Sequence, residues 1–315
     1  MTTYTDIKKD KYYKILWTGN HSMSLSFRKH KFTVKRNYIK YSFLVSVCGD
    51  EMRIEVEANE LVELEILYSW VCQIRRFEYL FDGSFYIMCK CCLDEVELTQ
   101  IIGKSENAYF QMERGKHIIK LQFNDRDYKR HFVNWIKLEK NFHLINQMLL
   151  YASNTRGITA DIRIAMLAEC YEPFALELEK RGYITVQKVL PAKPITCSKC
   201  GYQHLNKNRS RKTLGSCLES VIRVYGKPVF STEYRRKRSL VKHIVKTRNK
   251  IFHVKTNSKG ALGGGQSGFY AIKLDWMYRY IILCLVTGNR QIMDYELEKN
   301  VLAFETTFPQ LVYHI

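Results

Sequence analysis

Apolar and polar residues alternate along the first part of the chain, a pattern typical of β-strands with one buried face. Four segments show this alternation, at residues 12–17, 31–35, 41–47 and 52–56. Short segments of this kind, close together in the sequence, pair most simply as an antiparallel sheet. We therefore expect a β-rich N-terminal domain.

One helix is expected to follow these strands, over residues 60–80. Its apolar residues recur at three- and four-residue steps between Leu61 and Phe77, which is the spacing of one helix face. An Asp-Gly turn ends the pattern. Strand-like sequence returns at 85–89 and 117–123.

The pattern becomes helical from about residue 132. The expected helices cover residues 132–152, 159–180, 213–226, 238–255, 269–287 and 291–300. The sequence predicts an α+β fold, with a β-rich domain over 1–130 and an all-α helical bundle over 131–315. Residues 181–212 read as a loop. The Gly-rich run 259–268 reads as a flexible linker or, alternatively, as a lid over a site.

Composition places this chain among globular proteins of reducing compartments. Hydrophobic residues make up 46% of it, and we find no apolar run of the ~18 residues that a membrane span needs. The first residues lack the basic-then-apolar pattern of a signal peptide. Ten cysteines without regular spacing indicate reduced thiols, so we expect a cytoplasmic protein.

Positive charge is concentrated in one segment of the chain. The net charge is +19, yet residues 180–274 alone hold 22 Lys and Arg against only Glu219 and Glu233. A polyanion is the natural partner of such a segment, because neutralised phosphates release counterions. A solvated lysine-rich face explains diffuse charge better than this confinement, and an anionic membrane surface is a weaker third alternative. We expect nucleic acid.

A short motif, Arg248-Asn249-Lys-Ile-Phe-His253, ends the helix expected over 238–255. On a helical wheel Arg248 falls within the apolar stripe of Val241, Ile244, Val245 and Phe252. A charge in such a stripe needs a partner. Asn249 and His253 share the neighbouring face, and His253 is about 140° around the axis from Arg248.

These residue types suit RNA cleavage without a metal. His253 would act as general base or acid towards the ribose 2′-OH, because histidine is the side chain most often used for proton transfer near neutral pH. Arg248 would hold the phosphate as charge builds on it, and Asn249 would orient both. The products would carry a 2′,3′-cyclic phosphate and a 5′-hydroxyl. An interfacial arginine beside a satisfied core histidine is the alternative, because short motifs match freely.

Residues ~135–315 resemble a HEPN ribonuclease domain, most closely that of ApeA-like abortive-infection proteins, in which the motif takes the form Lys246-Thr-Arg-Asn-…-His253. The N-terminal half is similar to the β-rich domain of that family, and residues 67–86 are the stretch that supports this likeness. The resemblance implies a homodimer that pools two motifs in one cleft, and a toxin acting in antiphage defence. It further implies that catalysis needs no cofactor, that tRNA is among the expected substrates, and that a phage-derived trigger activates the enzyme.

Further basic residues near the motif are candidates for RNA binding, namely Lys246, Lys250, Arg235, Arg236, Arg238 and Lys242. Glu219 is a candidate auxiliary catalytic residue, or else the structural partner of a nearby arginine. The competing function is a catalytically silent protein that binds RNA or DNA through the same basic surface.

A Cys-x-x-Cys pair, Cys197 and Cys200, has the form of half a structural zinc site. Two more ligands would be needed, and the candidates (His204, Cys217, Cys170, Cys89 and Cys92) lack diagnostic spacing. Free reduced thiols are the alternative.

Overall fold

We describe the fold from a computed structural model of the chain. It describes residues 10–20, 27–83, 86–94, 96–100, 123–155, 157–189, 195–196, 198–201, 203–204, 210–254 and 259–312. The chain forms two compact units that interleave along the sequence. The first comprises residues 1–140, 154–157 and 279–297, and the second comprises 141–153, 158–278 and 298–315. The expected division at residue 130 stays a prediction about independently folding domains.

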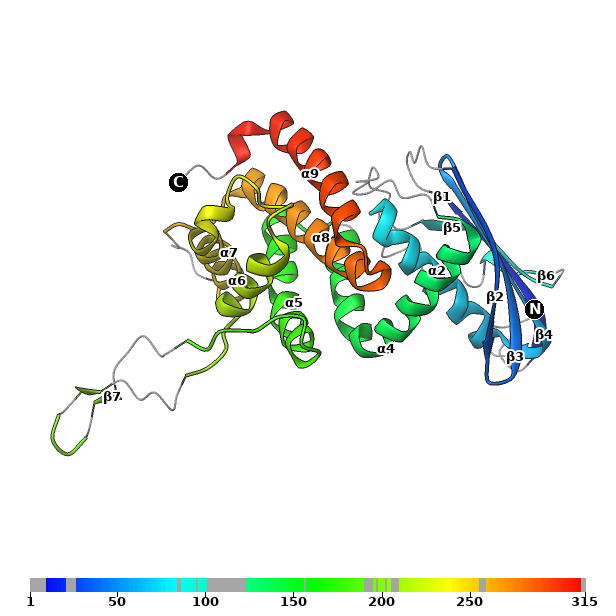
Figure 1. The fold of residues 1–315 in the computed structure, drawn as a ribbon, viewed down its shortest axis with the longest axis horizontal. Coiled ribbons are helices and arrows are strands. Elements are labelled where there is room, and N and C mark those ends of the chain that lie inside the picture. Colours follow the sequence, from blue (N-terminus) through cyan, green and yellow to red (C-terminus); the bar gives the residue numbers. More distant parts are fainter. Residues whose placement is uncertain are drawn as a thin grey trace. The chain divides into compact units, whose positions relative to one another are not determined.

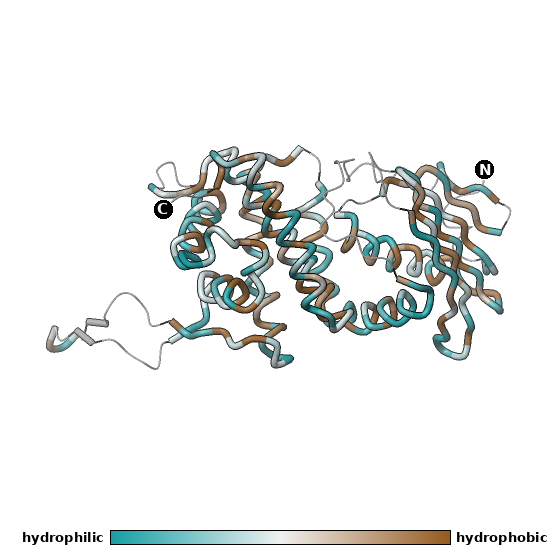
Figure 2. Tube along the Cα trace, turned by 45° about the horizontal axis from the view of Figure 1, so that its top comes forward, coloured by the Kyte–Doolittle hydropathy of each residue, from teal (hydrophilic) through white to brown (hydrophobic). Residues whose placement is uncertain are grey.

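The first unit contains a six-stranded antiparallel sheet that has helices along one face (Figure 1). Its strands, in the order β2-β3-β4-β1-β5-β6, are Phe27–Arg36, Ile39–Cys48, Glu51–Glu63, Lys11–Asn20, Ile87–Leu93 and Val96–Glu97. The alternation of hydrophobic and hydrophilic residues is visible along them (Figure 2). The predicted α+β class with a β-rich N-terminal part is thus confirmed.

Two tight turns set the register of β2, β3 and β4. Asn37 and Tyr38 both adopt positive φ between the paired residues Arg36 and Ile39, which is the geometry of a two-residue hairpin turn. Gly49, with φ 64°, helps close the next hairpin. The expected strand at 117–123 lies outside the described residues, apart from Phe123, which is not in a strand.

Helix α2 (Leu64–Asp82) packs its apolar face on this sheet. Trp70 contacts Phe43 of β3, and Phe77 contacts Phe132 of α4 (Asp125–Asn154), so aromatic rings form much of this core. The helix begins four residues later than expected, because β4 continues to Glu63. Gly83 ends it in the left-handed conformation, where the Arg279 side chain leaves no room for a Cβ.

Helices build the second unit. They are the end of α4, α5 (Ala160–Lys180), α6 (Leu214–Tyr225), α7 (Lys237–Phe252), most of α8 (Gly264–Thr287) and the end of α9 (Arg290–Thr307), with the short 3-10 helices η2 (Tyr234–Arg236) and η3 (Pro309–Leu311). At its core Lys273 is fully buried between Glu233 and Glu305. The pairing is needed because an isolated buried charge is costly.

Two loop predictions need correction. The run 259–268 is not a linker throughout, because Gly264–Gly268 form the first turn of α8. Within 181–212, a short hairpin pairs β7 (Ile195–Thr196) with β8 (Gln203–His204). In the part of the chain that the structure describes, we find no helix long and apolar enough to cross a membrane.

Candidate active site

Helix α7 carries the Arg–His motif and is fixed by a narrow buried face. Leu240, Val241, Ile244 and Thr247 form this face, against α5 and α6. The Thr247 hydroxyl donates to the carbonyl of His243 and accepts from the backbone N–H of Leu262 (2.8 Å), which ties the residues after the helix to its side. The motif therefore lies at the end of an anchored helix.

Arg248 forms an ion pair within the same chain. Its Nε donates to Oε2 of Glu169 on α5 at 2.6 Å, and its Nη1 donates to Oδ1 of Asn249 at 2.8 Å. The guanidinium also lies 5.4 Å from the ring centroid of Phe252. The Arg248 and Glu169 side chains are 22% and 38% exposed, so the site is open to solvent. The partner that a charge in the apolar stripe requires is thus Glu169.

The expected core stripe of α7 is only partly core. Val241 and Ile244 are buried, but Phe252 is 46% exposed, so its assignment to the core was wrong. A helical wheel predicts which residues share a face, but it does not predict how far along the helix other elements pack on that face. The packing on α7 ends before its last turn, and Phe252 forms part of the surface beside Arg248.

His253 directly follows α7 as its C-cap residue and is exposed. Its backbone N–H donates to the carbonyl of Asn249 at 3.1 Å. Val254 then adopts φ 46°, a left-handed conformation unusual for a β-branched residue, which turns the chain out of the helix. The helix expected to reach residue 255 therefore ends at Phe252, and an accessible imidazole stands at its end.

An apolar surface adjoins the Arg248–Glu169 pair. Leu144, Met148 and Tyr151 follow one another at four- and three-residue steps on α4, and Leu144 is 68% exposed. They line a cavity of about 530 Å³ together with Gln147, Met166, Glu169, Cys170 and Phe252. Exposed apolar surfaces of this kind commonly mark interaction sites.

The basic candidates divide into two groups. Arg238, Lys242, Lys246 and Lys250 recur every four residues and form one row along α7, whereas Arg235 and Arg236 are exposed in η2 before it. Glu219 on α6 accepts a hydrogen bond from Nε of Arg238 at 2.9 Å. Arg238 lies about 15 Å along the helix from Arg248. Of the two interpretations of Glu219, this contact favours the structural partner.

The structure leaves the zinc prediction untested. Cys197 lies outside the described residues, while Cys200 is an exposed free thiol. Cys170 and Cys217 are both buried in helices. Burial, with a smaller effect of the Glu169 charge, raises the pKa of Cys170 to about 12. Among the described residues, no group of three or more His, Cys, Asp or Glu side chains is arranged to hold a metal.

Glu169 is the site residue that sequence reasoning missed. It lies 79 residues before its partner in a helix that also contains Glu172, Glu177 and Glu179, and no local signal distinguishes it from them. Comparisons of the chain with protein-family models, curated proteins and solved structures give no significant match. The site must therefore be interpreted from its own geometry.

Proposed function

We propose that this protein is a metal-independent endoribonuclease of the HEPN type, with Arg248, Asn249 and His253 as its catalytic residues. The observation that carries the proposal is their arrangement at the end of α7. Arg248 is held by Glu169 and Asn249, and the exposed His253 directly follows the end of the helix. A guanidinium with further N–H donors and an exposed imidazole five residues later are the two kinds of group that 2′-OH attack on a phosphodiester requires.

The reaction needs one proton removed and one returned. His253 takes the proton of a ribose 2′-OH, and the resulting oxygen attacks the adjacent phosphorus. The bond from phosphorus to the 5′ oxygen breaks, and that oxygen is protonated as it leaves. Arg248 donates hydrogen bonds to the phosphate oxygens as negative charge builds on them. The products are a 2′,3′-cyclic phosphate and a 5′-hydroxyl.

A second copy of the chain completes this site in the proposal. The apolar surface of Leu144, Met148 and Tyr151 borders the cavity that contains Glu169 and Phe252. Covering it with the same surface of another copy would bring two motifs towards one two-fold axis. The second histidine would then be available to protonate the leaving oxygen.

Leu144→Asp tests the dimer, because it places a charge on the proposed interface at a position already exposed. Leu302→Asp, at a similarly exposed leucine of α9, is the matched control. By light scattering after gel filtration, we expect dimers for the wild type and Leu302→Asp and monomers for Leu144→Asp. A monomeric wild type, or a dimeric Leu144→Asp variant, would contradict the proposed interface.

His253→Ala tests the activity. In EDTA, the wild-type protein should cleave total cellular RNA and leave 2′,3′-cyclic phosphate ends, whereas the variant should bind RNA without cleaving it. If wild-type protein leaves RNA intact, and does so even when it is purified from phage-infected cells, the protein binds nucleic acid without cleaving it. The observation that favours this second candidate is that Arg248 already has a carboxylate partner in its own chain.

The resemblance extends the proposal to the biology. We propose a cytoplasmic toxin of antiphage abortive infection, activated by a phage-derived trigger, with tRNA among its substrates. Sequencing RNA ends from cells that express the wild type or His253→Ala would identify the cleaved RNA. Loss of phage protection in the variant would tie cleavage to defence.

A further inference from the structure

A basic groove lies beside the motif helix, between the first turns of α6, the segment 187–189 and α7. Its cavity measures about 630 Å³. The lining residues are Gln187, Lys188, Val189, Thr213, Gly215, Ser216, Glu219, Ser220, Arg238, Val241, Lys242, Val245 and Lys246. Volumes of this order are typical of sites that enclose a small ligand.

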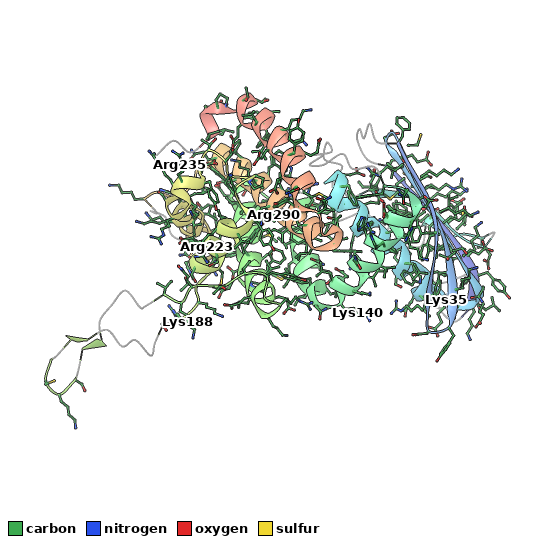
Figure 3. The ribbon with its side chains drawn as sticks, viewed as in Figure 1. Lys35, Lys140, Lys188, Arg223, Arg235 and Arg290 are labelled. Carbon is green, nitrogen blue, oxygen red and sulfur yellow. The ribbon has the colours of Figure 1, made fainter. Side chains whose placement is uncertain are left out.

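Four cations and one carboxylate line this groove. Lys188 and Lys242 are exposed, and Lys246 donates to a backbone carbonyl, that of Lys259. The single carboxylate, Glu219, accepts a hydrogen bond from Arg238. The groove therefore keeps a net positive charge after its one ion pair is counted. Lys188, Arg223 and Arg235 are labelled on this unit in Figure 3.

The groove wall is held in place without a ligand. Val189 pairs with Arg211 through two backbone hydrogen bonds of 2.8 and 3.1 Å, which ties the segment 187–189 to the residues that precede α6. Arg223 on α6 donates to the carbonyl of Thr185 at 3.0 Å. A wall fixed in this way costs little to order when a ligand binds.

The side chains in the groove, and not the end of α6, supply the positive charge. Thr213 and Ser216 form a capping box in which each side chain accepts from the other's backbone N–H. Two backbone N–H groups at the start of α6 are therefore already hydrogen-bonded within the helix end. A ligand would therefore meet lysine and arginine side chains above an apolar floor of Val241 and Val245.

The groove leads towards the catalytic end of α7. Asn249 lies four residues after Val245 and seven after Lys242, so it continues the helix face that lines the groove. At 1.5 Å per residue, Lys242 and Asn249 are about 10 Å apart along the axis. His253 follows one turn later. A strand bound along the lysine row would thus pass to Asn249 and His253.

We infer that this groove binds the phosphodiester backbone of single-stranded RNA and directs it to the motif, an inference that rests on the proposed nuclease function. Cations at four-residue steps match a chain of phosphates, and the apolar floor suits a sugar or base face. A cavity of about 630 Å³ has the size of about one or two nucleotides and is too small to enclose a duplex. This inference makes Lys188, which lies outside the motif helix, a substrate-binding residue.

The test uses the full-length His253→Ala protein, so that cleavage does not disturb binding. A fluorescein-labelled single-stranded oligoribonucleotide is titrated at several salt concentrations, and binding is followed by anisotropy. Adding Lys188→Ala and Lys242→Ala should weaken binding about tenfold at low salt. It should also reduce the slope of log K against log salt by about 1.4, the value for two lost phosphate contacts.

The matched control removes two exposed lysines elsewhere, Lys35 and Lys140 (Figure 3). This control lowers the net charge by the same amount but leaves the groove unchanged. It should therefore shift the affinity for RNA much less. If both double variants behave alike, or if duplex RNA binds as tightly and with the same dependence on Lys188 and Lys242, the inference is wrong.

Cleavage assays separate this outcome from failure of the nuclease. The double lysine variant made with His253 intact should lose cleavage at low RNA concentration and recover it at saturating RNA, as a binding defect does. Groove-dependent binding by a wild type that does not cleave would support the groove and refute the nuclease. Normal cleavage with groove-independent binding would do the reverse.

Discussion

The ion pair between Arg248 and Glu169 gives the sharpest prediction about the motif. Glu169 binds Nε of the guanidinium at 2.6 Å and Asn249 binds Nη1, which leaves Nη2 for a phosphate. Glu169 is therefore expected to act as a positioning residue that aims Arg248. Glu169→Ala should release the guanidinium, whereas Glu169→Gln keeps an oxygen that can accept from Nε.

The expected magnitudes separate catalysis from stability. Because both side chains are partly exposed, the pair should contribute only about 0.2–1 kcal/mol to the free energy of unfolding. If Arg248 stabilises the transition state as proposed, misplacing its guanidinium should reduce kcat by about tenfold to hundredfold, equivalent to about 1.4–2.7 kcal/mol. The effect on kcat should thus exceed the effect on folding.

Single-turnover cleavage of a labelled RNA and urea unfolding provide the two measurements. We expect Glu169→Ala to lower the cleavage rate at saturating RNA, and Glu169→Gln to restore much of it. If Glu169→Ala cleaves faster than the wild type, the carboxylate restrains Arg248 and the positioning role is refuted. An equal loss of cleavage rate in Glu169→Ala and Glu169→Gln would also contradict the positioning role. It would mean that the acceptor oxygen, which glutamine keeps and alanine lacks, does not matter.

Three further predictions concern buried groups. Lys273→Met should destabilise the second unit by about 3–5 kcal/mol in urea unfolding, because it leaves two buried glutamates without their cation; a loss below about 1 kcal/mol would contradict this pairing. Cys170, whose pKa burial raises to about 12, should resist iodoacetamide at pH 8 while exposed Cys200 reacts, and equal alkylation by mass spectrometry would show that Cys170 is accessible. Burial lowers the pKa of His131 below that of the unfolded chain, so the unfolded state binds its proton more readily and stability should fall as pH drops below about 6.5. His131→Phe should reduce the pH dependence of the urea unfolding midpoint. An unchanged pH dependence would show that other groups cause it.

The parts of the fold that depend on local pattern were predictable from the sequence. Strict alternation located β1 to β4, and periodic apolar residues located α5, α6 and α7 within a few residues. Errors arose where local pattern does not decide. Gly264 reads as linker because helix propensity disfavours glycine, yet it begins α8, showing that local propensity is only a weak prior.

The candidate site divides in the same way. Arg248, Asn249 and His253 are recognisable from their spacing on one helix. Glu169 and Lys188 belong to other segments, and only the tertiary structure brings them beside α7. Phe252 shows the converse error, since its place on an apolar helix face predicted burial that the fold does not provide.

The positions of Arg248 and His253 around the axis of α7 predict that the proposed nuclease needs two chains. Asn249 continues the groove face of α7 and His253 follows the helix as its C-cap residue, whereas Arg248 lies about 140° around the helix axis from His253. The Arg248 guanidinium contacts Glu169, Asn249 and Phe252. The guanidinium and the imidazole of one chain thus start from different faces of α7, and they must span this separation to meet at one phosphate of an RNA strand. Association of two copies through the apolar surface would place the Arg248 of one near the His253 of the other. The monomeric Leu144→Asp variant should then keep groove binding and lose cleavage, and a monomer that cleaves at the wild-type rate would show that the two residues converge within one chain.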